Sequence, residues 1–437
     1  MALVYPDNLA ALGVCRALGT KGIPVTVLSS DRSAPAQYSR YARREACPPD
    51  ATESELVDFL VKFGRARRQV SVLFLTDDAS IVTVHRHRPL LEEWYRFPLS
   101  PWPILQRIIL KDQLYRSLEG VVPVPRTRIL AEESELADAA REIGSPALVK
   151  PVLRCVSDSH DAGRLPFEKL FGFKAVRVHN LKELTRTYRA ARARGFSLLL
   201  QQEIDGAVSS LCSLGLYASR DGSMAAAFTS RKLCQVPPDF GDGLIVQAAR
   251  VPELIPLGER VVRHFGYYGL ADIEFKWDAR DRTYKLLDFN PRPWLWINLL
   301  TAGGVNLPYA AYLDALGEGL DGAAFVQRDF EMRWVSLRGL LVYLVRWLKE
   351  GRRWNDLRFL PGHYLGGRRV GPLFDTGDLL IRMFLSPGYW LDSLRQGARN
   401  IQRLPARRTS DESGARASRG ADEQTISLEN RNAGGTR

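Results

Sequence analysis

Side chains able to bind a metal ion and phosphate groups gather between residues 268 and 293. Glu274 lies in one alternating segment, and Asp288 and Asn290, two residues apart and therefore on one face of an extended chain, lie in the next. Such hard oxygen ligands suit Mg²⁺, which proteins commonly hold with one or two carboxylates beside nucleotide phosphates. Arg292 continues the spacing and supplies a fixed cation for a phosphate or acyl-phosphate oxygen.

Two strands and a tight connection are needed to position these residues. ADIEFKW (271–277) and TYKLLDFN (283–290) alternate their side chains between two faces, and DARDR (278–282) supplies a turn. We therefore expect a β-hairpin that places carboxylates on neighbouring strands. A solvated hairpin with its acids in water is the alternative. Asp288 argues against it, because an acid inside the apolar run LLDF needs a partner to offset its desolvation.

The segment LLDFNPRP (286–293) resembles the ATP-grasp superfamily, whose members end a metal-binding hairpin in (Glu/Asp)-x-Asn-Pro-Arg, with a carboxylate or amide on the adjacent strand. The matching positions are Glu274, Asp288, Asn290 and Arg292, and the resemblance implies ATP and Mg²⁺ as cofactors. Further segments look like the N-terminal domain of predicted ATP-dependent carboxylate-amine ligases, a branch that includes D-aspartate ligase. These segments are GIPVTVLSSD, QYSRY, FLTDD and KDQLY, and the resemblance covers roughly the first three quarters of the chain.

The resemblance also implies roles for residues outside the hairpin. Lys111 and Lys150 match lysines that contact nucleotide phosphates, and Arg231 best matches an arginine that meets the γ-phosphate or the acyl-phosphate intermediate. Glu203 and the backbone of Ile204 match the hinge that faces the adenine amino group. From the residues alone, both lysines could instead be structural groups that extend to solvent, and Arg231 could belong to a solvated Arg-Lys pair.

Two features of the superfamily pattern are altered in this chain. After Lys150 the superfamily usually carries a glycine-rich loop that folds over the phosphates through backbone N–H groups. Here residues 154–174 contain only two glycines, Gly163 and Gly172. We therefore expect a phosphate lid that is either rebuilt from serine and arginine side chains or compromised. Residues 208–210 are Val-Ser-Ser where an acid often binds the ribose, which leaves ribose recognition unassigned.

The N-terminal region predicts a strand-helix-strand unit that opens a doubly wound sheet, from ALVYPD to IPVTVLSSD. The loops after its parallel strands, residues 6–8 and 76–78, would face a ligand crevice at the carboxyl edge of the sheet. Asp77 and Asp78 could bind a substrate amine or hydroxyl there, or cap the helix that begins near residue 79. The three spaced glycines of the dinucleotide fingerprint are absent, which disfavours a nicotinamide enzyme.

Composition predicts a cytoplasmic protein. The five cysteines are scattered without metal-ligand spacing, as expected for reduced thiols. We find no secretory signal, and the longest apolar run, residues 340–345, is too short for a transmembrane segment. The formal charge of +12 supports an anionic partner, but much of the excess lies in the Arg-rich residues 333–408 without a nucleic-acid-binding motif, so no nucleic-acid partner is expected.

We predict a mixed α/β and α+β architecture. Its parts are a doubly wound, Rossmann-like pre-ATP-grasp domain (1–112), a two-lobed ATP-grasp domain (113–327), a C-terminal helical extension (328–404) and a disordered tail (405–437). The extension contains an amphipathic segment, residues 336–353. Its basic face could make peripheral contact with an anionic membrane, or its apolar face could pack on the protein's own body.

The expected reaction joins a small-molecule carboxylate to an amine, or to another nucleophile such as a thiol. ATP would first convert the carboxylate to an acyl phosphate, and ADP and phosphate would be released, with catalysis arising mainly from positioning and charge neutralisation. Two alternatives stand: an ATP-binding module with weakened turnover, and a peripheral membrane or scaffold protein acting through its basic C-terminal helices. The sequence names neither the substrates nor the oligomeric state, and a homodimer is one arrangement to test.

Overall fold

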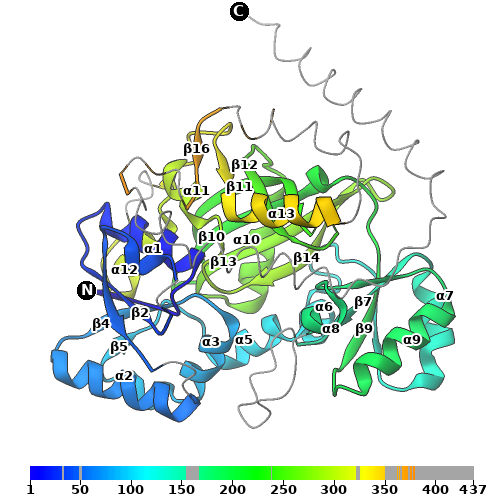
Figure 1. Ribbon diagram of the computed structural model, residues 1–437, viewed down its shortest axis with the longest axis horizontal. Coiled ribbons are helices and arrows are strands. Elements are labelled where there is room, and N and C mark those ends of the chain that lie inside the picture. Colours follow the sequence, from blue (N-terminus) through cyan, green and yellow to red (C-terminus); the bar gives the residue numbers. More distant parts are fainter. Residues whose placement is uncertain are drawn as a thin grey trace, which may run out of the picture.

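The computed structural model describes residues 1–31, 34–48, 52–153, 167–237, 239–320 and 325–349, together with residues 362, 364, 367–372, 375, 377 and 378. Two predictions lie largely or wholly outside these residues: the altered phosphate lid, of which residues 154–166 are not among those described, and the disordered tail. The described chain forms an N-terminal domain, a small lobe and a large central sheet, and helices α5 (Trp102–Ile109) and α6 (Lys111–Leu118) lie between the N-terminal sheet and the small lobe (Figure 1).

The N-terminal domain is a parallel five-stranded sheet in the order β3-β2-β1-β4-β5, so the predicted doubly wound topology is present. Its strands are β1 Ala2–Tyr5, β2 Val25–Ser29, β3 Ala42–Ala46, β4 Ser71–Leu75 and β5 Tyr95–Arg96. Its helices are α1 Leu9–Gly19, η1 Ala36–Tyr38, α2 Glu53–Arg67, α3 Asp78–Arg86, α4 Arg88–Leu91, α5 Trp102–Ile109 and α6 Lys111–Leu118. The strand order reverses between β1 and β4, which puts the predicted ligand crevice at the carboxyl ends of these two strands.

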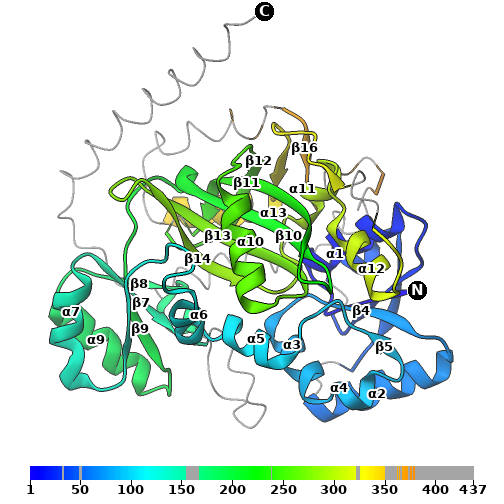
Figure 2. The same cartoon turned by 180° about the vertical axis from the view of Figure 1, so that it is seen from behind.

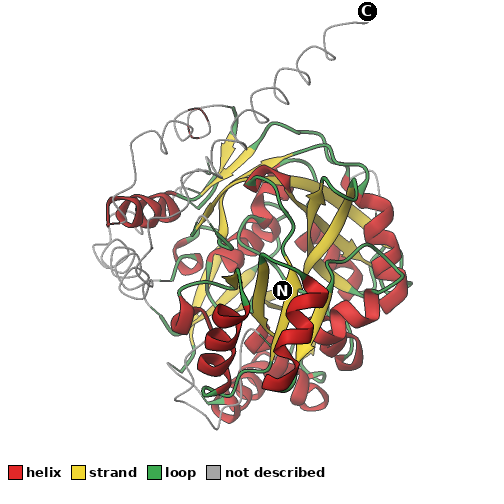
Figure 3. Cartoon of the chain, turned by 90° about the vertical axis from the view of Figure 1, so that its right-hand side faces the viewer, coloured by secondary structure: helices red, strands yellow, loops and turns green. Residues whose placement is uncertain are grey.

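The small lobe is an antiparallel sheet in the order β6-β9-β7-β8 that packs against helices α7 and α9 around its own apolar core. Its strands are β6 Thr127–Leu130, β7 Ala147–Pro151, β8 Val176–Val178 and β9 Leu198–Gln202. Its helices are η2 Glu133–Glu135, α7 Leu136–Ile143, α8 Phe167–Phe171 and α9 Leu181–Arg192. Because this core is separate, the small lobe is a distinct packing unit, seen at one side of the chain in Figure 1. Figure 3, a view along the long axis, shows helices around the strands of the chain.

The central sheet has seven strands in the order β14-β13-β10-β11-β12-β15-β16. They are β10 Leu211–Ala218, β11 Met224–Val236, β12 Asp242–Ala248, β13 Gly269–Asp278, β14 Thr283–Asn290, β15 Arg333–Val335 and β16 Arg369–Val370. The accompanying helices are η3 Val208–Ser210, α10 Leu254–Phe265, α11 Ile297–Ala302, α12 Leu307–Ala315 and α13 Leu337–Lys349. Helix α10 covers the face seen in Figure 2, and α13 lies on the side seen in Figure 1.

The N-terminal domain and the central sheet share one apolar core, to which β1, α1, α11 and α12 contribute. Gly13 allows α1 to approach α11 closely, because a Cβ atom at this position would lie 2.5 Å from Cγ2 of Ile297. Because of this shared core, the crevice of the N-terminal sheet and the hairpin of the central sheet keep a fixed position relative to each other. The candidate site lies where the two meet.

The described part of the C-terminal extension is mixed rather than purely helical. Strands β15 and β16 add to the edge of the central sheet, next to β12. Helix α13 buries Tyr343 and Trp347, and Tyr343 packs with Cys234, Leu244 and Val335 of the sheet. The alternative of packing on the protein's own body therefore holds for this helix. In the part of the chain that the structure describes, no helix combines the length and apolar character needed to cross a bilayer.

Candidate active site

The predicted hairpin is present and carries the candidate site. β13 and β14 pair antiparallel, with Glu274 opposite Asp288 and Asp272 opposite Asn290. Since alternate residues of a strand share a face, these four oxygen-bearing side chains lie on one surface of the sheet. The side chains of Glu274 and Asp288 are each 24% exposed, so a ligand can reach both carboxylates.

Three cations from different elements pair with acids at or next to this surface. Lys111 Nζ, at the start of α6, lies 2.6 Å from Asp288 Oδ1. Lys232 Nζ, on β11, lies 3.5 Å from Glu274 Oε1. In the third pair Arg292 Nε, just after β14, lies 2.6 Å from Asp78 Oδ1 of the N-terminal domain. These contacts link the N-terminal domain to the hairpin of the central sheet. Each of the three cations faces an acid, so the charges of the group nearly balance.

Lys150 lies on strand β7, and the residues just after this strand contact the backbone of Lys111. The backbone N–H of Lys111 donates to the carbonyl of Val152, two residues beyond Lys150. The Lys150 ammonium donates to Gln201 Oε1 at 2.6 Å, and the Gln201 amide donates in turn to Thr127 Oγ1. The small lobe therefore holds Lys150 in a fixed polar network rather than leaving it to extend to solvent.

Arg231 is the predicted residue that the structure does not bring to the hairpin surface. It is paired across the sheet with Cys212, on the face that packs against α10, whereas Ser213 pairs with Glu274 on the opposite face. The neighbouring Lys232 points to the hairpin surface instead, with its side chain 7% exposed and its ammonium 5.7 Å from the ring centre of Trp296. The cation at this point of the site is therefore Lys232.

Asp272 is a site residue that the sequence analysis missed. It is 1% exposed, its Oδ2 lies 3.5 Å from the Asn290 amide, and its Oδ1 has no hydrogen-bond partner among the described residues. Burial, reinforced by Glu274, raises the pKa of Asp272 well above its usual value, while Lys232 opposes the shift. The available signal was its position two residues before Glu274 on the same strand.

The two acids after β4 have different roles. Asp77 is the N-cap of α3, because its Oδ1 accepts a hydrogen bond from the backbone N–H of Ser80 at 2.7 Å. The capping alternative is therefore correct for Asp77 and wrong for Asp78. Asp78 is the first helical residue, and its carboxylate binds Arg292. A small cavity lined by Asp78, Lys111, Asp288 and other residues places this acid of the N-terminal domain at the hairpin site.

The predicted adenine hinge follows β9 and is surrounded by cations. Arg177 donates to both carboxylate oxygens of Glu203 at 2.6 to 3.0 Å, and Arg280 donates to the Glu203 carbonyl. Lys276 donates to the Ile204 carbonyl at 2.8 Å. The Glu203 carboxylate is thus engaged by an arginine, and adenine contact at Glu203 and Ile204 stays a prediction.

The donor set of the hairpin suits a hard cation. Within the described ranges, no group of three or more His, Cys, Asp and Glu side chains is arranged to hold a metal ion. Glu274, Asp288 and Asn290 instead offer two carboxylates and an amide on one surface. This set fits Mg²⁺, which retains several waters and takes other ligands from nucleotide phosphates. These three residues remain the predicted ligands.

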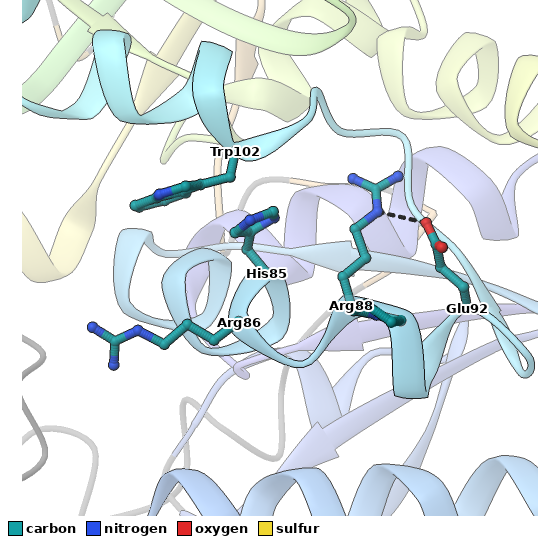
Figure 4. Close-up of a pocket in the computed structure, with 6 residues that line it drawn as sticks. His85, Arg86, Arg88, Glu92 and Trp102 are labelled. Atoms are coloured by element: carbon teal, nitrogen blue, oxygen red, sulfur yellow. Dashed lines mark hydrogen bonds and ion pairs between the residues drawn. The ribbon is translucent and has the colours of Figure 1, made fainter.

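A larger open cavity, of about 530 Å³, lies in the N-terminal domain at the opposite ends of α3 and α5 from the site (Figure 4). His85 stacks on Trp102 there, with ring centres 5.0 Å apart. Its arginines are paired with acids: Arg88 with Glu92, and Arg86 with an acid of α2. None of the predicted site residues lines this cavity, so it is separate from the candidate active site.

Comparison with known protein sequences supports the resemblance to the ATP-grasp superfamily. Residues 222–337 match a family described as ATP-grasp in the biosynthetic pathway with Ter operon. The chain is also 23% identical over 291 residues to D-aspartate ligase of Enterococcus faecium (strain Aus0004), an alignment that covers 64% of this chain and 68% of that protein.

Solved structures show a similar fold. The biotin carboxylase domain of Hydrogenobacter thermophilus 2-oxoglutarate carboxylase, in complex with MgADP, ADP and bicarbonate, matches 76% of this chain and 72% of its own, with a TM-score of 0.57 and 18% identity. N5-carboxyaminoimidazole synthetase of Staphylococcus aureus, complexed with ADP, matches 73% and 77%, with a TM-score of 0.55 and 14% identity. The predicted fold class and the resemblance to the ATP-grasp superfamily are confirmed.

Proposed function

Because the chain has the ATP-grasp fold, we propose that it is an ATP-dependent ligase that joins a small-molecule carboxylate to an amine through an acyl phosphate. The observation that carries the proposal is the hairpin surface, where Glu274, Asp288 and Asn290 face cations from α6 and β11. Phosphoryl transfer needs this combination, because its catalysis depends on positioning and neutralising charge rather than on covalent work by the protein.

Binding of MgATP would exchange the partners of the charges in the site. Lys111 and Lys232 are held by the carboxylates of Asp288 and Glu274. Phosphate oxygens would take over the two ammonium groups, and the freed carboxylates, with Asn290, would hold Mg²⁺. The ion would supply neutralisation of phosphoryl charge. This preformed arrangement keeps the cations in place before the nucleotide arrives.

The nucleotide would extend from this surface to the small lobe. Lys150, fixed by Gln201, would contact the phosphates, and the hinge at Glu203 and Ile204 would receive the adenine. Arg177 neutralises the Glu203 carboxylate, so recognition at the hinge would use backbone groups more than this acid. In this proposal Lys232 takes the γ-phosphoryl contact that the sequence assigned to Arg231.

The carboxylate and the nucleophile would bind where the N-terminal crevice meets the hairpin. Arg292 bridges this boundary through its ion pair with Asp78, and it would hold a carboxylate or acyl-phosphate oxygen. Trp294 and Trp296 are each 4% exposed and border the site. Their rings would exclude water from an acyl phosphate, which water would otherwise hydrolyse.

A trapping assay tests the proposed reaction. The purified chain would be incubated with MgATP, hydroxylamine and a panel of carboxylates, because hydroxylamine converts an acyl phosphate to a stable hydroxamate. Hydroxamate together with stoichiometric ADP supports the ligase, and Asp288→Asn should abolish both products. Asp281→Ala, in the exposed turn of the same hairpin, is the matched control and should retain both. Tight ATP binding without ADP release across the panel would favour the module with weakened turnover instead.

A further inference from the structure

Residues beyond the ATP-grasp region return to the N-terminal domain. Strand β16 pairs in parallel with β15 at the edge of the central sheet, with Arg369 beside Arg333. At Gly371, just after β16, the backbone runs against β15 so closely that a Cβ atom would lie 2.3 Å from the Val335 carbonyl oxygen. The described residues between 369 and 378 thus start at the edge of the central sheet and reach α1 of the N-terminal domain.

The guanidinium group of Arg16, on α1, binds this segment through hydrogen bonds. The Arg16 side chain is 3% exposed, and its Nη1 and Nη2 donate to the carbonyls of Gly371 and Pro372 at 3.0 and 2.9 Å. Its Nε donates to Asp378 Oδ2 at 2.8 Å, and Nη2 also donates to the Asp378 carbonyl. These four hydrogen bonds use most of the five N–H donors of the buried guanidinium, and an unpaired charge in the interior would be strongly destabilising.

Asp378 connects Arg16 to a turn of the N-terminal domain. Its side chain is 2% exposed, and its Oδ2 accepts a second hydrogen bond from Ser39 Oγ at 2.6 Å. Its Oδ1 accepts from the backbone N–H of Arg40 at 2.8 Å. Both carboxylate oxygens are therefore satisfied by groups of the N-terminal domain, which makes the contact specific in geometry as well as in charge.

The same turn is held from its other side by Asp7, which follows β1. Asp7 accepts from the backbone N–H groups of Ala36 and Gln37 at 2.7 and 3.1 Å. Asn8, the next residue, donates to Thr76 at the end of β4. Asp7 therefore stands at the point where the strand order of the N-terminal sheet reverses, which is where doubly wound sheets bind ligands.

We propose that the described residues 367–372, 375, 377 and 378 act as an interdomain strap that sets the position of the turn at residues 34–41, and through it of Asp7, at the ligand crevice. The strap ties the edge of the central sheet to the crevice through Arg16 and Asp378. Its role does not rest on the proposed ligase activity, because every contact is within the chain. The described residues beyond α13 thus reach the crevice edge of the N-terminal domain through Arg16 and Asp378.

Hydrogen exchange in the full-length chain tests the strap. Asp378→Ala should speed exchange of the amides between residues 36 and 42 at least tenfold, while exchange in the small-lobe sheet stays unchanged. Asp375→Ala is the matched control: this acid is 3.6 Å from Arg16 and 29% exposed, and its loss should leave the turn protected. A purely structural contribution would instead raise exchange throughout the molecule.

Two milder variants keep the test decisive if Asp378→Ala does not fold. Ser39→Ala removes the hydrogen bond to Asp378 and the acceptor of the Tyr41 amide, and should speed exchange of the turn amides other than Tyr41 less than Asp378→Ala does. Asp378→Asn keeps an acceptor for Arg40 and should give an intermediate rate. Unchanged exchange in the turn for Asp378→Asn and Ser39→Ala, or equal effects of Asp375→Ala and Asp378→Ala, would overturn the strap.

Discussion

Lys232 and Arg231 are adjacent on β11 but point to opposite faces of the central sheet, and replacing each by methionine separates their roles. Lys232→Met removes the ammonium 3.5 Å from Glu274, whereas Arg231→Met removes a guanidinium from the face packed on α10. A charge-assisted hydrogen bond contributes about 1.5–3 kcal/mol. If Lys232 binds a phosphoryl oxygen, its loss weakens MgATP binding about 10- to 150-fold.

Lys232→Met should lower the free energy of unfolding by somewhat less than it weakens the free energy of ATP binding. Two unit charges at 3.5 Å attract by about 5 kcal/mol at an effective dielectric constant near 20, but the desolvation of an ammonium that is 7% exposed offsets most of this. Glu274 remains 24% exposed and can be hydrated in the variant. We therefore expect a loss of about 1–2 kcal/mol in the free energy of unfolding.

Calorimetric titration with MgATP, paired with urea unfolding of each variant, measures both effects. Arg231→Met should keep MgATP affinity within about twofold, because it lies across the sheet from the site. If Arg231→Met lost nucleotide binding while Lys232→Met kept it, the assignment of the two faces to site and core would be refuted. Equal losses would indicate that both variants act through the stability of β11.

Two further predictions concern the positioning of the site. Burial raises the pKa of Asp7 to about 6 from an ordinary 3.8. The Asp7 carboxyl therefore binds its proton more tightly in the folded chain than in the unfolded chain. Its contribution to the free energy of unfolding is full below about pH 4, and about 3 kcal/mol is lost as the pH rises through 6. Asp7→Asn should remove that pH dependence, measured by urea unfolding at pH 4 and 7, and an unchanged slope would contradict the burial of Asp7. Gly215→Ala should cost about 1–3 kcal/mol in thermal unfolding, because its Cβ would lie 2.6 Å from Trp294 and from Leu300. Gly319→Ala, with open space around it, is the control, and equal values for the two would refute the close packing of Trp294 on the sheet.

Local pattern was sufficient to predict the hairpin, because alternation and a polar turn are properties of neighbouring residues. The same pattern placed Glu274, Asp288 and Asn290 on one surface, which the register of β13 and β14 bears out. Which of Arg231 and Lys232 points to this surface depends instead on how β11 pairs with β10. The sequence alone does not show that register, so it could not tell which of the two side chains reaches the site.

Long-range contacts could not be predicted from the sequence. Arg16 and Asp378 are separated by 362 residues, and nothing near either one indicates a buried ion pair. The pairing of Asp78 with Arg292 likewise joins two domains, so the helix-capping pattern after β4 gave no sign of which acid would cap and which would bind an arginine. The strands β15 and β16 were missed because they are three and two residues long.

The most direct test of the account is calorimetric titration of ATP into the folded chain with and without Mg²⁺, compared with the double variant Asp288→Ala, Asn290→Ala. The account predicts Mg²⁺-dependent ATP binding by the natural chain and its loss in the double variant, with Asp281→Ala behaving like the natural chain. Failure of the natural chain to bind ATP, or full retention of Mg²⁺-dependent binding by the double variant, would contradict the claim that this hairpin is a nucleotide and metal site.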